Sequence, residues 1–139
     1  MTDFVLDASV ALAWCFEDEA TVITRGVLER LTSEVAAVPG TWPIEIANVL
    51  ALAERRGRIT LADTAAFIAR LGDLAIVPDE ETSSRALTRI LDLARAERLT
   101  AYDAAYLELA MRLGVPLASK DRALGDAAKR VGVLVLGAG

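Results

Sequence analysis

Five short apolar runs alternate with longer stretches of helical periodicity, and this alternation limits the folds that the chain can adopt. Each run is too short for a helix, and β-branched residues occur in four of the five. None has the strict polar–apolar alternation of a strand with one face in water, so the runs are typical of strands buried on both faces. They cover residues 4–6, 35–38, 74–77, 116–118 and 131–136.

The intervening stretches carry apolar residues at helical spacing, as in the stripe formed by Leu61, Ala65, Ile68 and Leu71. Strands that alternate with helices predict a mostly parallel sheet, because each parallel pair needs a crossover connection. We therefore expect an α/β fold, a three-layer α/β/α sandwich with a mostly parallel central sheet of roughly five strands. The length of 139 residues fits a single domain, residues 1–139, and the 54% hydrophobic content is that of a globular protein.

Composition also bounds the location and the chemistry of the protein. No apolar run approaches the roughly 20 residues of a membrane span, and the first residues lack the basic region of a signal peptide. We therefore expect a soluble, cytoplasmic protein with no membrane association. Cys15 is the only cysteine, which excludes an internal disulfide or a thiolate metal cluster and predicts a small residue of the core.

Four acidic residues stand at or near the starts of predicted helices, in a chain without histidine: Asp7, Glu45, Asp103 and Asp121. Without imidazole, the chain lacks the usual proton shuttle at neutral pH and cannot form a histidine-ligated zinc site. If the four carboxylates converge, they suit a hard cation such as Mg²⁺ or Mn²⁺. In parallel sheets the ligand crevice lies at the carboxyl ends of the strands, where chain order places all of these acids except Asp103.

Helix geometry tests Asp103. In the predicted helix over residues 101–112, Glu108 and Arg112 are spaced i,i+4 and are typical of a pair on the solvent face. Asp103 lies about 140° from Glu108 and about 180° from Arg112 around the helix, so it is directed away from water. The alternative is that Thr100 and Asp103 form a capping box at the helix start.

Glu45 and Asn48 share one side of an otherwise apolar helix over residues 44–53. A buried carboxylate without a partner is costly, so Glu45 is expected to have one. Asn48 is expected to support the site or the fold rather than to be a metal ligand itself. The alternative for Glu45 is an acid in the first turn, after Pro43, that interacts favourably with the helix dipole.

Asp7 and Asp121 each precede a predicted helix and could serve simply as N-caps. Ser9 and Ser119 stand beside them, with hydroxyl groups suited to orient a carboxylate. Two carboxylates about 5 Å apart repel each other by roughly 3 kcal/mol at an effective dielectric of about 20. Four together would destabilise the fold or take up protons unless a cation intervenes, so the acids are either scattered caps or a metal site.

Four segments carry a resemblance to a known family. Residues 5–9 (VLDAS), 38–50 (VPGTWPIEIANVL), 100–107 (TAYDAAYL) and 118–121 (ASKD) resemble the PIN-domain ribonucleases, and most of all the VapC toxins of bacterial toxin–antitoxin pairs. The resemblance spans essentially the whole chain. It matches the three core acids of the family to Asp7, Glu45 and Asp103, and the fourth, more variable acid to Asp121, with Ser119 at the neighbouring Ser/Thr position.

The resemblance implies a metal-dependent endoribonuclease that cleaves RNA phosphodiesters with water activated by Mg²⁺ or Mn²⁺. The four acids would be catalytic and metal-binding, and Ser9, Asn48 and Ser119 would support them. It also implies a homodimer that is inhibited by a VapB-type antitoxin. The net charge of −5 argues against a broad electrostatic grip on nucleic acid, but not against a nuclease whose acids bind metal.

Three other classes of protein compete with this interpretation. A phospho-receiver domain using Asp7 would need an acid pair after the first strand, and a phosphatase-like domain would need a second acid at position 9, where this chain has Ser9. A binding module that keeps the fold without catalysis is the third class. The complete set of acids argues against it.

Overall fold

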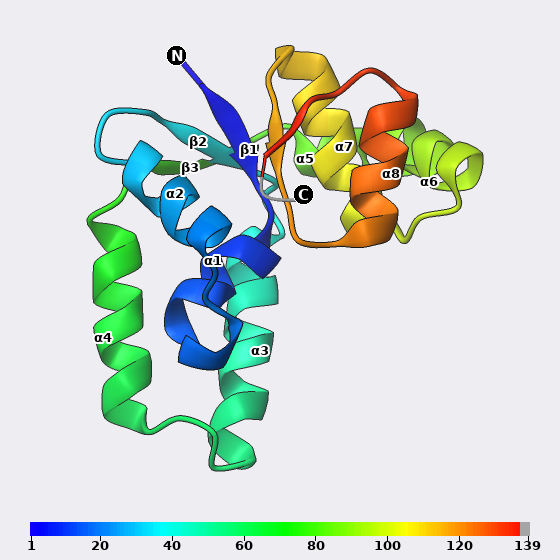
Figure 1. Cartoon of the computed structure of the whole chain (residues 1–139). Coiled ribbons are helices and arrows are strands. Elements are labelled where there is room, and N and C mark those ends of the chain that lie inside the picture. The colour runs from blue at the N-terminus through cyan, green and yellow to red at the C-terminus, as the bar shows by residue number, and fades with distance from the viewer. Residues whose placement is uncertain (137–139) are drawn as a thin grey trace.

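A computed structural model describes residues 1–136 of the chain, and within it five strands form one parallel sheet (Figure 1). The strand order is β3-β2-β1-β4-β5, and every neighbouring pair is parallel. The predicted mostly parallel, five-stranded sheet is therefore confirmed. The strands are β1 (Phe4–Leu6), β2 (Ala36–Val38), β3 (Ile76–Pro78), β4 (Leu117–Ala118) and β5 (Val135–Leu136).

Helices connect successive strands and cover the sheet, which confirms the predicted α/β sandwich. Figure 1 shows α1 to α4 below and to the left of β1, with α3 directly below it, and α5 to α8 to its right. They are α1 (Ala8–Cys15), a 3-10 turn η1 (Glu17–Glu19), α2 (Val22–Arg30), α3 (Trp42–Arg55), α4 (Leu61–Gly72), α5 (Thr82–Arg85), a π-helical turn η2 (Ala86–Ile90), α6 (Leu91–Glu97), α7 (Ala101–Leu113) and α8 (Arg122–Arg130).

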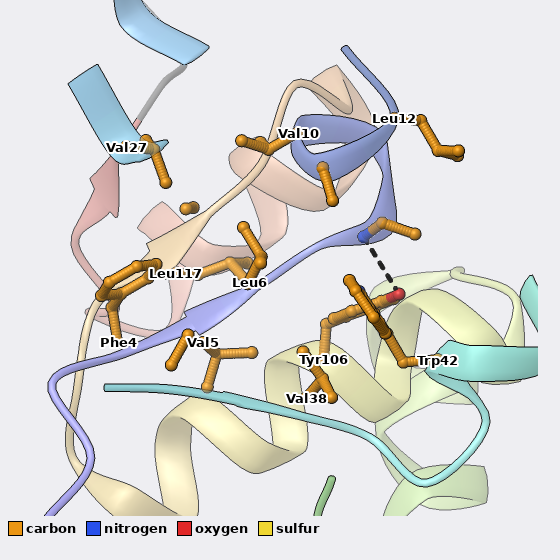
Figure 2. Packing of buried hydrophobic residues seen from close by; sticks show 14 of the residues in the cluster. Phe4, Val5, Leu6, Val10, Leu12, Val27, Val38, Trp42, Tyr106 and Leu117 are labelled. Atoms are coloured by element: carbon orange, nitrogen blue, oxygen red, sulfur yellow. Dashed lines mark hydrogen bonds between the residues drawn. The ribbon is translucent and has the colours of Figure 1, made fainter. Parts of the chain in front are cut away.

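The central strand β1 is buried on both faces. Phe4, Val5 and Leu6 are inaccessible to solvent, and Figure 2 shows Val10 of α1 on one side of β1 and Tyr106 of α7 on the other. Helices on both faces explain why this run has no polar alternation. Cys15, predicted as a core residue, is half-buried and packs against the edge of this core.

The last strand differs most from the sequence expectation. Only Val135 and Leu136 of the predicted run over residues 131–136 form a strand. Its first residues complete the end of α8 instead, where Gly132 has a φ of +81°, a conformation that glycine adopts without strain. Val133 then donates its N–H to Ala128 O at 2.8 Å. Residues 137–139, which the sequence assigned to the same domain, lie outside the described residues.

A cluster of ion pairs centred on Arg112 fixes the far end of α7. Arg112 contacts Asp79 at 2.6 Å and Glu108 at 3.0 Å. The predicted pair between Glu108 and Arg112 therefore exists, but the expectation that it faces solvent is wrong. Glu108 is only 8% exposed, because the segment after β3 covers this face of α7 and brings Asp79 onto Arg112.

The same segment is attached to the start of α3. Asp79 donates its N–H to Val38 O at 2.7 Å. Thr82 Oγ1 accepts the Gly40 N–H at 2.8 Å and donates to Asp79 Oδ2 at 3.2 Å. Burial opposes the ionisation of Asp79, but the hydrogen bonds and charge of Arg112 outweigh it and lower the pKa of Asp79. The cluster thus fixes α7 relative to the β2–α3 loop.

Among residues 1–136, none of the helices combines the length and the apolar character needed to cross a membrane.

Candidate functional site

Asp7 occupies the carboxyl end of the central strand β1. Its N–H donates to Ala118 O at 2.9 Å, which places it against the end of β4. Its carboxylate caps α1 by accepting the Ser9 N–H at 3.3 Å, as the N-cap alternative predicted. The carboxylate is nevertheless buried, with Asp7 only 5% exposed, so capping and a place inside the site coexist.

Both predicted supporting serines hold Asp7. Ser119 Oγ donates to Asp7 Oδ2 at 2.7 Å, and Ser9 Oγ donates to the same oxygen at 2.9 Å. Ser119 Oγ also accepts the Asp121 N–H at 3.0 Å, so one buried hydroxyl links two of the candidate acids. Asp121 uses Oδ1 to cap α8, accepting the Leu124 N–H at 2.9 Å.

Glu45 lies in the first turn of α3 and receives a hydrogen bond that sequence analysis did not foresee. Tyr106 donates its hydroxyl proton to Glu45 Oε1 at 2.9 Å. The same hydroxyl accepts the Ala8 N–H at 3.2 Å (dashed line in Figure 2). Because the N–H groups of a first helical turn have no partner within their helix, Tyr106 satisfies one of them and directs its single proton to Glu45.

One feature of the sequence could have identified Tyr106 as a residue of the candidate site. It lies three residues after Asp103 on α7, hence on nearly the same helical face. A tyrosine among apolar residues reads as a core residue, which Tyr106 also is, being inaccessible to solvent. Only the fold shows that its hydroxyl reaches α1 and α3.

Asp103 is half-buried in the first turn of α7, as predicted. Thr100 caps this helix by accepting the Asp103 N–H at 3.1 Å, which is one half of the capping box considered from sequence. Burial, followed by the charges of Asp121 and Asp7, raises the pKa of Asp103 to about 6. The carboxylate therefore lies within the field of the other acids.

The pKa values of Asp7 and Glu45 are affected in the same way. Burial raises the pKa of Asp7, against the opposing hydrogen bonds from Ser119 and Ser9, and the charge of Asp121 adds to the rise. Burial raises the pKa of Glu45 to about 7, with further contributions from Asp7 and Asp103 and an opposing one from Tyr106. In the described part of the chain, no basic side chain is among the groups that shift these three pKa values.

The donor set suits a divalent cation. All four candidate acids offer oxygen ligands, as Mg²⁺ and Mn²⁺ prefer, and their mutual repulsion would be relieved by positive charge. Among residues 1–136, however, no three acidic or cysteine side chains are arranged as a ready-made metal site. Metal binding by Asp7, Glu45, Asp103 and Asp121 therefore stays a prediction.

Asn48 and Lys120 are placed differently from the serines. Asn48 is exposed one turn beyond Glu45, in a hollow that it shares with Glu45 and Tyr102. Lys120 donates its backbone N–H to Ser9 Oγ at 3.2 Å, and its Nζ lies 3.8 Å from Glu19 Oε1. The support that the sequence predicted from Asn48 is not visible as a bond to an acid within residues 1–136.

Comparison with known proteins gives a consistent result. The family model of the PIN domain matches residues 4–130. A comparison with curated proteins finds no match.

Several solved structures share the fold. PAE2754 from Pyrobaculum aerophilum is 22% identical, with a TM-score of 0.70 over 96% of this chain and 83% of that one. FitAcB from Neisseria gonorrhoeae is 17% identical, with a TM-score of 0.64 over 96% of each chain. VapBC2 from Rickettsia felis, bound to a DNA fragment from their promoter, is 11% identical, with a TM-score of 0.66 over 96% of this chain and 97% of that one.

The raised pKa values predict how stability depends on pH. The folded-state values near 6 for Asp103 and 7 for Glu45 exceed the ordinary values of 3.8 and 4.5. The folded protein therefore binds protons more tightly than the unfolded chain, and this stabilisation is complete below the ordinary values and lost as pH rises through the folded ones. In EDTA, the melting temperature should fall by about 5 °C between about pH 5 and 8.

The absence of histidine leaves few other groups that titrate in this window. Thermal unfolding followed by circular dichroism measures the effect, and millimolar Mg²⁺ should reduce the decline because a cation replaces the protons. A melting temperature that is constant or rises with pH would show that these acids are not buried together.

The Tyr106 hydroxyl is predicted to position Glu45 for a cation. In Tyr106→Phe, the Ala8 N–H and the Glu45 carboxylate both lose a partner, which should destabilise the fold by about 1–2 kcal/mol. The affinity for Mn²⁺, measured by calorimetry, should fall by about tenfold because the carboxylate is no longer oriented. Thr24→Val is the matched control: it removes a buried hydroxyl from α2 and should lower stability without changing Mn²⁺ affinity. Equal Mn²⁺ affinity of Tyr106→Phe and the wild type would refute the positioning role.

Proposed function

The chain belongs to the PIN-domain family, and on that premise we propose that it is a Mg²⁺- or Mn²⁺-dependent endoribonuclease, the toxin of a VapC-type toxin–antitoxin pair. PIN domains are generally nucleases. The observation that carries the proposal is the cluster formed by Asp7, Glu45, Asp103 and Asp121. Burial, together with the charges of neighbouring acids of this group, raises the pKa values of Asp7, Glu45 and Asp103, and in the described part of the chain no basic side chain is among the groups that shift them.

In the proposed mechanism, Asp7, Glu45 and Asp103 would hold the cation, and Asp121 would assist the attacking water or a second ion. When bound, a divalent cation supplies a Lewis acid that lowers the pKa of water and offsets the charge that develops on the phosphate. Side chains of the protein orient these acids. Ser119 and Ser9 fix the Asp7 carboxylate through Oδ2. Tyr106 fixes Glu45 in the same way.

Asp121 has a distinct part in this mechanism. Its Oδ1 is engaged in capping α8, so Oδ2 would accept the hydrogen bond from the water that attacks the phosphorus. As the bond from the water oxygen to phosphorus forms, the bond from phosphorus to the 3′ oxygen of the preceding nucleotide would break. The water would lose a proton, the 3′ oxygen would gain one from solvent and leave as a hydroxyl, and the next nucleotide would keep the phosphate on its 5′ side. Because the chain contains no histidine, no imidazole is available as a general base.

An antitoxin partner is part of the proposal. Two of the similar structures are described as FitAcB and VapBC2. The surface also offers a place for a partner segment that is partly charged: a hollow of about 730 Å³ whose walls combine Trp14 with charged side chains such as Asp63 and Arg70. Nearby on α4, Leu61 is 76% exposed. We propose in addition that the protein acts on RNA as a homodimer, as its resemblance to VapC toxins implies.

The phospho-receiver and phosphatase alternatives gain no support. Position 9, where a phosphatase would carry its second acid, holds Ser9, whose hydroxyl donates to Asp7. A non-catalytic binding module on the same fold is the competing proposal, and a cleavage assay distinguishes it from a nuclease.

The proposal predicts cleavage of single-stranded or looped RNA in Mg²⁺ or Mn²⁺ that stops with EDTA and leaves 5′-phosphate ends. Asp7→Asn, Glu45→Gln and Asp103→Asn should each lower the rate by about 10²-fold or more, because each removes charge from the cation's ligands but little volume. Asp121→Asn should have a milder effect. Rates on a labelled RNA, together with end-group analysis, test this.

Asp126→Asn is the matched control, since Asp126 is exposed on the same helix that Asp121 caps and should be neutral. Expression without a partner should arrest growth, and the Asp7→Asn variant should relieve the arrest. Cyclic phosphate ends would instead indicate attack by the 2′-OH. A fully active Asp7→Asn protein would remove both the nuclease assignment and the metal mechanism.

A further inference from the structure

A hollow of about 540 Å³ opens beside the candidate metal site, between the first turns of α3 and α7. Its walls are Thr41, Ile44, Glu45, Asn48, Val49 and Tyr102. Glu45 belongs both to this hollow and to the acid cluster. Tyr102 directly precedes Asp103, and Ile44 directly precedes Glu45, so the fold that assembles the acids also assembles these walls.

The walls combine exposed apolar surface with hydrogen-bonding groups. Tyr102 is 61% exposed and Ile44 is 72% exposed, although both adjoin half-buried acids. Asn48 presents an exposed amide, which offers two donors and an acceptor. Within residues 1–136, the Thr41 hydroxyl is buried without a hydrogen-bond partner. A ligand with a flat apolar face and a polar edge would match this combination.

We propose that the hollow is a nucleobase subsite, in which the base beside the scissile phosphate stacks on Tyr102 and presents its edge to Asn48. The inference rests on the proposed ribonuclease function and deepens it. Among the residues that the structure describes, no basic side chain lines the hollow and Glu45 is its only charged wall, so the site suits a neutral base rather than a phosphate. Aromatic stacking and edge contacts of this kind are how single-stranded RNA is read.

The position of the hollow agrees with this occupant. A phosphate held at the acids would lie next to Glu45, and the base of the adjoining nucleotide would be within reach of a wall that starts at the same residue. Stacking accepts every base, because each has an apolar face, whereas the Asn48 amide discriminates between edges. Tyr102 should therefore set affinity, and Asn48 should set base preference.

The test measures equilibrium binding of a short oligoribonucleotide that contains the fluorescent base 2-aminopurine, with Ca²⁺ in place of Mg²⁺ to limit cleavage. Tyr102→Ala should weaken binding by about tenfold and abolish the fluorescence quenching that accompanies stacking. Tyr102→Phe, which keeps the ring, should restore both. Leu113→Ala is the matched control, since it removes an exposed apolar side chain from the other end of α7. In the cleavage assay, Asn48→Ala should flatten the base preference next to the cut, whereas Leu113→Ala should leave that preference as it is in the wild type.

The outcomes separate the two proposals. If the wild type cleaves RNA but Tyr102→Ala binds the probe as tightly as the wild type, the subsite is refuted and the nuclease stands. If the wild type does not cleave RNA but binds the probe in a Tyr102-dependent way, the nuclease fails and the subsite stands. If Tyr102→Ala changes the sedimentation coefficient and leaves RNA binding intact, a second copy of the chain covers the hollow and the subsite is refuted.

Discussion

The burial of a carboxylate at the end of the central strand is the constraint on which the candidate site depends. Asp7 follows a strand that has a parallel neighbour on each side, so its side chain emerges where the ends of β2 and β4 also meet. Both neighbouring connections carry acids to this edge. Ser9 and Ser119 satisfy Asp7 but bring no positive charge. The parallel topology therefore concentrates negative charge that the described chain does not balance locally.

Acidic side chains have different surroundings at the two ends of α7. At the end of α7, Glu108 is buried against Arg112, which also binds Asp79. At the start of the same helix, Asp103 has acids rather than arginines among the groups that shift its pKa. The ion pairs of Arg112 with Asp79 and Glu108 fix the fold. Thr82, which donates a hydrogen bond to Asp79, also accepts the N–H of Gly40, and Gly40 lies just before α3, the helix that carries Glu45. The other group of acids, formed by Asp7, Glu45, Asp103 and Asp121, is positioned by these contacts, and it is the group that we propose to bind a cation.

The sequence predicted the features that follow from local pattern. Short apolar runs indicated buried parallel strands, and the places of Asp7, Glu45 and Asp121 after those strands indicated a common edge. What failed depended on contacts between distant segments. The helical periodicity placed Glu108 in solvent, because periodicity reflects a single helix. It carries no information about the segment after β3, which covers Glu108. The Tyr106 hydroxyl was missed because its partners, Ala8 and Glu45, come from two other helices. Asn48 is exposed in the structure, and its supporting role stays a prediction.

The central claim, that the unbalanced carboxylates form one divalent-cation site, is tested most directly by calorimetric titration of Mn²⁺ into the RNA-free protein and into Asp7→Asn. The account predicts saturable binding at millimolar concentration or below in the wild type, with a higher melting temperature by mass action. It predicts the loss of both effects in Asp7→Asn, since the variant lacks the most buried of the four charges. Equal binding by the two proteins, or no saturable binding by the wild type either with or without substrate RNA, would contradict it.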